Sequence, residues 1–128
     1  MKLNYDKAQL EAVVDKVAER TMNMDMTWDW PCGVAYYGIT EAYEATGNKK
    51  YLDMVKERVD ELISLGLPDF TVNTCAMGHV LLTLYKETGD ETYKKIIDDK
   101  LDYLTNHALR FGDHVLQHTV SANNDFPE

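Results

Sequence analysis

Residues that could bind a sugar gather in three short segments of the sequence. The first segment carries two tryptophans on either side of an aspartate, the second an asparagine and a histidine, and the third a histidine beside a glutamine. Aromatic rings stack on the CH faces of a sugar, and carboxylates and amides bind its hydroxyl groups. The residues that we single out are Trp28, Asp29, Trp30, Asn73, His79 and His118.

Structural roles compete with this interpretation. Both tryptophans could plug the end of the hydrophobic core, and Asn73 could cap the helix that follows it. A histidine on an apolar helix face, such as His79, is more often a hydrogen-bonded core residue than a catalyst. His114 and His118 with Asp113 are only a weak metal signal, because no further ligands stand at a suitable spacing. We therefore expect no metal and no other cofactor.

The elements that position these segments repeat along the chain. Residues 42–51 return 42 residues later as residues 84–93, with matching tyrosine, threonine and glycine positions. A repeat of this length is typical of a helical hairpin stacked on its own copy. One hairpin cannot bury its apolar face alone, so the copies are expected to pack side by side.

Five helices are expected from the hydrophobic periodicity. In each repeat a mostly apolar helix, expected to be buried on most sides, precedes a helix with one apolar stripe and a charged face. The charge runs 56–58 and 98–100 are interpreted as solvated faces. Residues 110–128 are expected to be non-helical, with some strand character over 114–120. The expected helices cover residues 6–21, 32–46, 49–65, 74–88 and 91–109.

Composition limits the classes of partner. The chain has 128 residues, 45% of them hydrophobic, and a net charge of −9 from 13 basic and 22 acidic residues. That charge argues against nucleic acid or an anionic membrane as the main partner. No apolar run approaches the roughly 20 residues of a membrane span. Two cysteines, Cys32 and Cys75, without a secretory signal are interpreted as reduced thiols of a cytoplasmic protein.

The sequence contains no Gly-rich phosphate loop, no serine-centred elbow and no Cys-x-x-Cys pair. The motif-bearing segments, taken in order, nevertheless resemble the glycoside hydrolase family 105 proteins. These are unsaturated rhamnogalacturonyl hydrolases, related to the unsaturated glucuronyl hydrolases of family 88. The resemblance covers essentially the whole chain. It rests on Trp28-Asp29-Trp30-Pro31-Cys32-Gly33-Val34-Ala35-Tyr36-Tyr37-Gly38, Glu41-Ala42-Tyr43-Glu44-Ala45-Thr46-Gly47, Thr71-Val72-Asn73-Thr74-Cys75-Ala76-Met77-Gly78-His79 and Leu116-Gln117-His118-Thr119-Val120.

The resemblance implies an all-α fold, an (α/α)6 barrel of six helical hairpins arranged as an inner and an outer ring. We expect residues 1–128 to form a single partial domain, the first two to three hairpins of such a barrel. The expected partner is an oligosaccharide that ends in a 4,5-unsaturated uronic acid, a product of pectin cleavage by a lyase. In the family an Asp protonates the ring double bond, water adds at the adjacent carbon, and the hemiketal opens to release the sugar.

The resemblance also assigns roles to residues. Asn73 stands where many relatives have a second Asp, and Trp30 and His118 stand where the family has sugar-contacting side chains. With Trp28 and His79 they form the predicted substrate-binding set. The principal acid, in a Trp-Ala-Asp type of motif, is expected shortly beyond Glu128, so we expect this chain alone to be inactive.

Inner helices without the rest of a barrel would expose apolar surface, which predicts a homo-oligomer or a rearranged bundle. The alternative function is a helical-repeat module that binds carbohydrate or protein without catalysis. A solenoid binder would place aromatic and polar residues along a concave helical face, whereas a toroid enzyme gathers them in loops at one end. The distribution in this sequence is the second.

Overall fold

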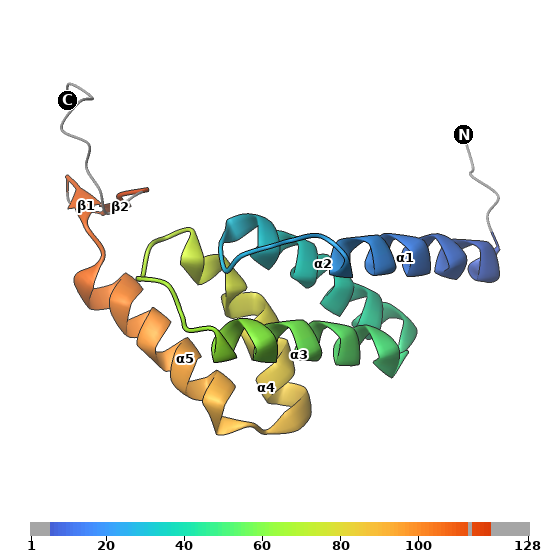
Figure 1. Cartoon of the computed structure of the whole chain (residues 1–128). Coiled ribbons are helices and arrows are strands. Elements are labelled where there is room, and N and C mark those ends of the chain that lie inside the picture. The colour runs from blue at the N-terminus through green and yellow to red at the C-terminus, as the bar shows by residue number, and fades with distance from the viewer. Residues whose placement is uncertain (1–5, 113, 119–128) are drawn as a thin grey trace.

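The structure, a computed structural model, describes residues 6–112 and 114–118 and confirms the expected all-α fold (Figure 1). A two-stranded antiparallel ribbon is the only sheet in those residues. The elements are α1 (Lys7–Met22), α2 (Trp30–Thr46), α3 (Lys49–Ser64), the 3-10 turn η1 (Thr74–Met77), α4 (Gly78–Thr88), α5 (Glu91–Asp102), the π-turn η2 (Tyr103–His107), β1 (Arg110–Phe111) and β2 (Val115–Leu116).

The helix boundaries follow local capping chemistry. Asp6 forms the N-cap of α1, with a reciprocal capping box to Gln9. Helix α2 begins two residues earlier than expected, because Asp29 caps it and Pro31 is tolerated in its first turn. The fourth expected helix starts as the 3-10 turn η1, and the fifth ends in η2.

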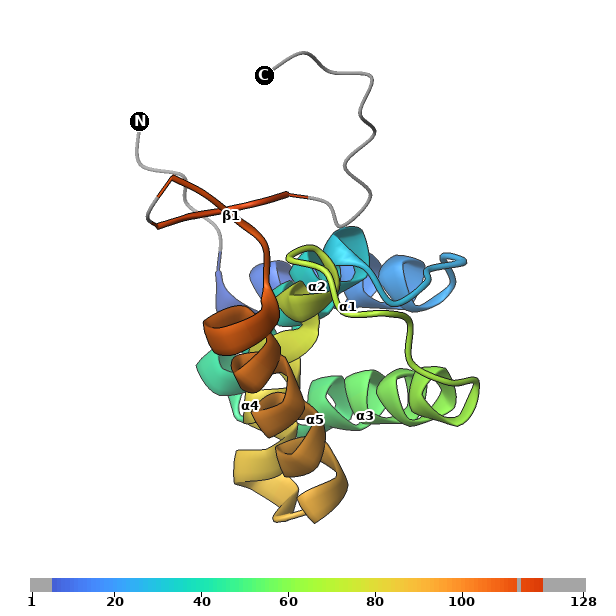
Figure 2. The same ribbon diagram turned by 90° about the vertical axis from the view of Figure 1, so that its left-hand side faces the viewer.

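The helices form an inner and an outer set. Helix α2 packs against α1, α3, η1 and α4, and α4 packs against α5. In Figure 1 α5 lies on the left-hand side of the molecule, and Figure 2 shows the molecule from that side. One continuous core joins the helices. Its buried apolar residues are Ala18, Trp28, Cys32, Tyr36, Ile39, Tyr51, Leu52, Val55, Val59, Leu62, Met77, Val80, Leu81, Leu84, Tyr93, Ile96 and Ile97.

The sequence repeat is a structural repeat. Gly47 and Gly89 end α2 and α4 in the left-handed conformation, with φ of 68° and 70°. In the next helix of each repeat a buried tyrosine donates its hydroxyl to an aspartate of the preceding outer helix. Tyr51 binds Asp15 of α1 at 2.5 Å.

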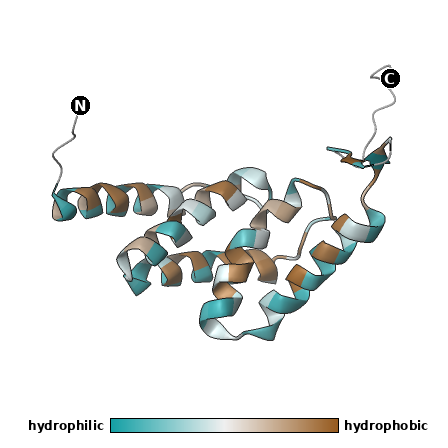
Figure 3. Cartoon of the chain, turned by 180° about the vertical axis from the view of Figure 1, so that it is seen from behind, coloured by the Kyte–Doolittle hydropathy of each residue, from teal (hydrophilic) through white to brown (hydrophobic). Residues whose placement is uncertain are grey.

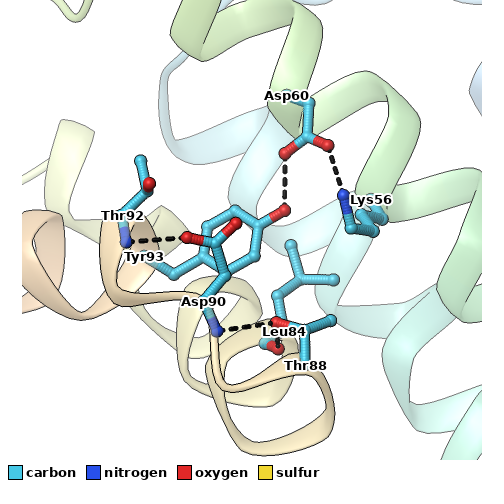
Figure 4. A network of polar contacts seen from close by, with 7 residues as sticks. All are labelled: Lys56, Asp60, Leu84, Thr88, Asp90, Thr92 and Tyr93. Atoms are coloured by element: carbon cyan, nitrogen blue, oxygen red, sulfur yellow. Dashed lines mark hydrogen bonds and ion pairs between the residues drawn. The ribbon is translucent and has the colours of Figure 1, made fainter.

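In the second repeat Tyr93 binds Asp60 of α3, also at 2.5 Å (Figure 4). Asp60 in addition accepts a hydrogen bond from Lys56. We call these two contacts the tyrosine–aspartate joints. Each joint connects two consecutive outer helices through one tyrosine–aspartate hydrogen bond.

Two faces are less buried than the periodicity predicts. Helix α2 is not covered on most sides, since Val34 is 61% and Tyr37 43% exposed. On α1 the apolar positions do share a face, yet Leu10, Val13 and Val17 are each at least half exposed, and hydrophobic colouring recurs along this helix (Figure 3). No described element packs over these side chains.

The interpretation of residues 98–100 as a solvated face is wrong at one position. Lys100 is only 3% exposed, whereas Asp98 is exposed as expected. The reason is helical geometry, because Lys100 falls on the same side of α5 as Ile96 and Ile97, which are buried. Among the described residues, no helix combines the length and the apolar character that a bilayer crossing requires.

Candidate functional site

Two of the three motif segments meet at one end of the helices. Residues 27–29, the end of α3 and residues 65–74 surround an open hollow of about 800 Å³. Its polar lining comes from Asp29, Asp69, Asn73 and three threonines, and its apolar lining mainly from Leu62, Leu65, Leu67 and Trp28. This is the combination of apolar walls and a few polar groups that ligand sites present. The segments that were predicted to converge therefore do so in two cases.

Trp28 lines the hollow, whereas Trp30 does not. Trp28 is 5% exposed and donates its indole Nε1–H to the Thr74 carbonyl at 3.1 Å. Trp28 therefore closes the end of the hydrophobic core, which was the structural role considered for both tryptophans. Trp30 is 51% exposed at the first position of α2. Asp29 between them accepts a hydrogen bond from the Trp30 backbone N–H at 2.7 Å, so its carboxylate is engaged as a helix cap.

Asn73 does not cap the following helix. Its side chain makes no cap hydrogen bond to η1, although the residue lines the hollow. Thr71 and Thr74 order this turn instead. The Thr74 N–H donates to Thr71 Oγ1 at 3.1 Å, and the Thr71 N–H donates to Thr74 Oγ1 at 2.9 Å. This reciprocal pair resembles a capping box and leaves the Asn73 amide available to a ligand.

The two segments touch through their backbones at Gly33. A Cβ at this position would lie 2.7 Å from the carbonyl carbon of Ala76, which is closer than side chains tolerate. Glycine thus allows α2 and η1 to approach, which brings Trp28 and Asn73 to the same hollow.

His79 is not a core residue, because its side chain is exposed on the first turn of α4. Its ring packs beside Tyr37 of α2, with the centroids 5.4 Å apart and the planes tilted by 49°. A hydrogen bond to the Glu41 carboxylate raises the pKa of Tyr37. Trp30 and Tyr37 are seven residues apart, so both lie on the exposed face of α2.

His118 follows β2 and is exposed, and it does not line the hollow. The described part of the third segment, residues 116–118, therefore does not join the other two segments in lining the hollow. Asp113 and residues 119–120 lie outside the described residues, and so does the metal hypothesis that involved Asp113. Residues 6–112 and 114–118 contain no group of three or more side chains that could hold a metal ion.

Comparison with known proteins places this geometry in a family. The sequence model of Glycosyl Hydrolase Family 88 matches residues 5–128. The chain belongs to glycosyl hydrolase family 88. This confirms the expected resemblance, in which family 88 is the relative of family 105.

One relative in this group is the unsaturated rhamnogalacturonyl hydrolase YesR of Bacillus subtilis. It is 45% identical over 120 residues, which are 94% of this chain and 35% of YesR. Two crystal structures described as possible members of glycoside hydrolase family 105 share the fold. The Klebsiella pneumoniae protein gives a TM-score of 0.86 at 20% identity over 97% of this chain and 38% of its own. The Salmonella enterica serovar Paratyphi A protein gives 0.86 at 22% identity over 97% and 39%.

The family 88 chain therefore spans a little over a third of the length of these relatives.

Several residues at or near the site were not predicted from the sequence. Asp69 and Thr71 line the hollow, Tyr37 packs on His79, and Lys100 lies beneath Trp28. The seven-residue spacing from Trp30 to Tyr37, which places both rings on one face of a helix, would have indicated Tyr37. Nothing in the mixed charge run of residues 98–100 distinguishes a buried lysine from a solvated one.

Proposed function

We propose that this protein acts in the hydration of a 4,5-unsaturated uronic acid at the non-reducing end of pectin-derived oligosaccharides, as an unsaturated rhamnogalacturonyl hydrolase. The observation that carries the proposal is the 45% identity to YesR across 94% of the chain, which includes all the motif segments. An oligosaccharide of this kind is the proposed partner, without nucleic acid or membrane. The free thiols of Cys32 and Cys75 support a cytoplasmic location.

The geometry supports a division of roles among the proposed site residues. Asn73 lines the hollow with a side chain that caps nothing, so it suits a secondary catalytic position that holds the attacking water or a sugar hydroxyl. An amide cannot exchange a proton as a carboxyl group does, so Asn73 is not the general acid. Trp28 forms part of the wall of the hollow. Trp30 and His79 lie outside its lining and are proposed to offer their exposed rings to the sugar faces, and His118 is proposed as a further contact on the resemblance alone.

We propose that residues 1–128 form a single partial domain of an (α/α)6 barrel. The proposed general acid is a carboxyl group in the rest of that barrel. Asp29 and Asp69 are the carboxylates that line the hollow, and the first of them is engaged as a cap.

An assay on an unsaturated rhamnogalacturonan disaccharide tests this proposal, with hydrolysis followed by loss of the absorbance of the conjugated double bond. We expect the 128-residue chain to bind the disaccharide without turnover, and a chain extended to the length of its relatives to hydrolyse it. Turnover by the chain alone would contradict the placement of the acid and point to Asp29 or Asp69. Absence of activity in the extended chain would contradict the function.

Binding without catalysis is the second candidate function. The exposed rings of Trp30, Tyr37 and His79 on the inner helices favour it, because an aromatic surface suffices to bind a sugar. The same assay separates the two candidates, since a binding module stays inactive when extended.

We also propose that the chain self-associates, with the exposed apolar side chains of α2 and α4 as the contact.

A further inference from the structure

A lysine is buried behind the candidate site without a carboxylate partner. Lys100 of α5 is 3% exposed, and no ion pair joins it to any residue in the described part of the chain. Burying an unpaired ammonium group is costly unless other groups replace its water. Its neighbours must therefore supply that stabilisation, and they belong to both site segments.

The ammonium group contacts the site through one carbonyl and two aromatic rings. Nζ donates to the Thr74 carbonyl at 3.1 Å. It also lies 5.3 Å from the ring centroid of Trp28 and 4.9 Å from that of Phe70, both within cation–π range. Phe70 in turn packs on Tyr103, with the centroids 5.6 Å apart.

Thr74 is the point at which these contacts converge. Its carbonyl accepts hydrogen bonds from Trp28 Nε1 and from Lys100 Nζ, each at 3.1 Å. The three residues come from the segment before α2, from η1 and from α5. One carbonyl therefore ties together the two segments that line the hollow and the last helix.

We propose that Lys100 is a positioning residue of the candidate site, whose ammonium group holds the Thr74 carbonyl and the Trp28 ring and thereby fixes the segments that carry Asp29 and Asn73. Lys100 acts through Trp28 and Thr74, both of which line the hollow. The inference deepens the proposed function and rests on it only where oligosaccharide binding is measured.

The charge of Lys100 is part of this arrangement. Burial lowers its pKa, and the Cys75 thiol on η1, whose own pKa is raised by burial, is the titratable group that faces it most directly. Tyr103, another titratable group, packs against the Phe70 ring rather than against Lys100. Deprotonation would weaken both cation–π contacts, so raising the pH is expected to loosen the Trp28 segment.

Tryptophan fluorescence tests the proposal without any substrate. The chain has two tryptophans, so Trp30→Phe leaves Trp28 as the only source of tryptophan emission. In that background Lys100→Met removes the donor and the charge but keeps the apolar stem. We expect the acrylamide quenching constant of Trp28 to rise about twofold or more, as for a segment that opens locally. Lys95→Met is the matched control on the same helix, because its side chain is 76% exposed.

Unchanged quenching and emission in Lys100→Met would overturn the proposal. If circular dichroism shows that this variant does not fold, a pH titration of Trp28 emission in the Trp30→Phe background tests the proposal instead. A transition below the usual lysine range that persists in Cys75→Ser supports the role of Lys100, and its absence overturns it.

Oligosaccharide binding gives the separate functional arm. In the parent chain that keeps Trp30, we expect Lys100→Met to raise the Kd for the unsaturated disaccharide about tenfold, while Lys95→Met leaves the Kd unchanged. A parent that does not bind the disaccharide contradicts the proposed function but leaves the fluorescence result on Lys100 intact. A Kd in Lys100→Met equal to that of a binding parent contradicts the positioning role.

Discussion

Trp28 and Trp30 lie two residues apart, but only one of them is accessible to a ligand. We predict that Trp30→Ala weakens binding of the unsaturated disaccharide by on the order of tenfold, because an exposed stacking surface is lost. Its free energy of unfolding should change by less than about 0.5 kcal/mol, as is usual for exposed positions. Calorimetric titration and urea unfolding measure the two effects.

Trp28→Ala provides the contrasting control. It removes a buried ring and one of the two donors to the Thr74 carbonyl, so we expect a loss of about 3–5 kcal/mol in unfolding free energy. Equal destabilisation by the two substitutions would contradict the assignment of Trp28 to the core and Trp30 to the surface.

The hydroxyl of Tyr93 links stability to alkaline pH. Burial, together with the hydrogen bond to Asp60, raises the pKa of Tyr93 from 10.0 to about 12. The folded state thus keeps the phenol protonated more firmly than the unfolded state does. The resulting stabilisation is complete below pH 10 and is lost as the pH rises towards about 12.

We therefore predict that Tyr93→Phe lowers the unfolding free energy by about 0.5–1.5 kcal/mol at pH 8, the usual value of one hydrogen bond. The difference between parent and variant should shrink above pH 10 and vanish near about 12. Urea unfolding across this range measures it. Tyr85→Phe is the control, since its hydroxyl makes only a long, exposed contact of 3.5 Å to Glu91. A pH-independent difference for Tyr93→Phe would refute the linkage.

At the scale of elements, the close crossing of α2 and η1 depends on one glycine. Gly33→Ala would place a Cβ 2.7 Å from the backbone of Ala76, so η1 must shift. We predict a loss of about 1–3 kcal/mol, as for other overpacked sites. Gly38→Ala on the same helix meets no atom within 4 Å and should stabilise the fold by about 0.4–1 kcal/mol. Thermal unfolding compares the two, and equal shifts in Tm would contradict the crossing.

The helices themselves were predictable because their signals are local. The caps at Asp6, Gly47 and Gly89 and the 42-residue repeat place three of the five helices, α1 to α3, to within two residues, and α4 ends at the expected residue. The 3-10 start at Thr74 was not predictable, because it depends on the hydrogen-bond exchange between Thr71 and Thr74.

Burial was less predictable than helix position. Periodicity identifies the apolar face of α1 and α2 but not whether another element covers it. Helix α2 was expected to be buried on most sides, yet its Val34 is exposed, and Val13 on the apolar face of α1 is exposed too. In the site, residue types indicated the hollow lined by Trp28 and Asn73. The burial of Lys100 is a tertiary effect that no local pattern contains.

At the scale of the whole molecule, exposed apolar side chains determine how the chain associates. Val34 on α2 and Leu82 on α4 are 61% and 51% exposed. We predict a concentration-dependent increase in mass by light scattering, and that Val34→Lys shifts the equilibrium towards the monomer. Val13→Lys on α1 is the control, with a similarly exposed side chain on the outer set of helices. If only Val13→Lys produces the monomer, the contact lies on α1 and the proposed surface is wrong.

The tyrosine–aspartate joints have a consequence for synthesis of the chain on the ribosome. Each joint connects residues that are only 36 or 33 positions apart, so both partners leave the ribosome within a short interval. At about 5–20 residues per second, that interval is about 2–7 s. Each outer helix can therefore be secured to the preceding one while translation continues, and the growing chain never has to keep more than about one hairpin of apolar surface undocked.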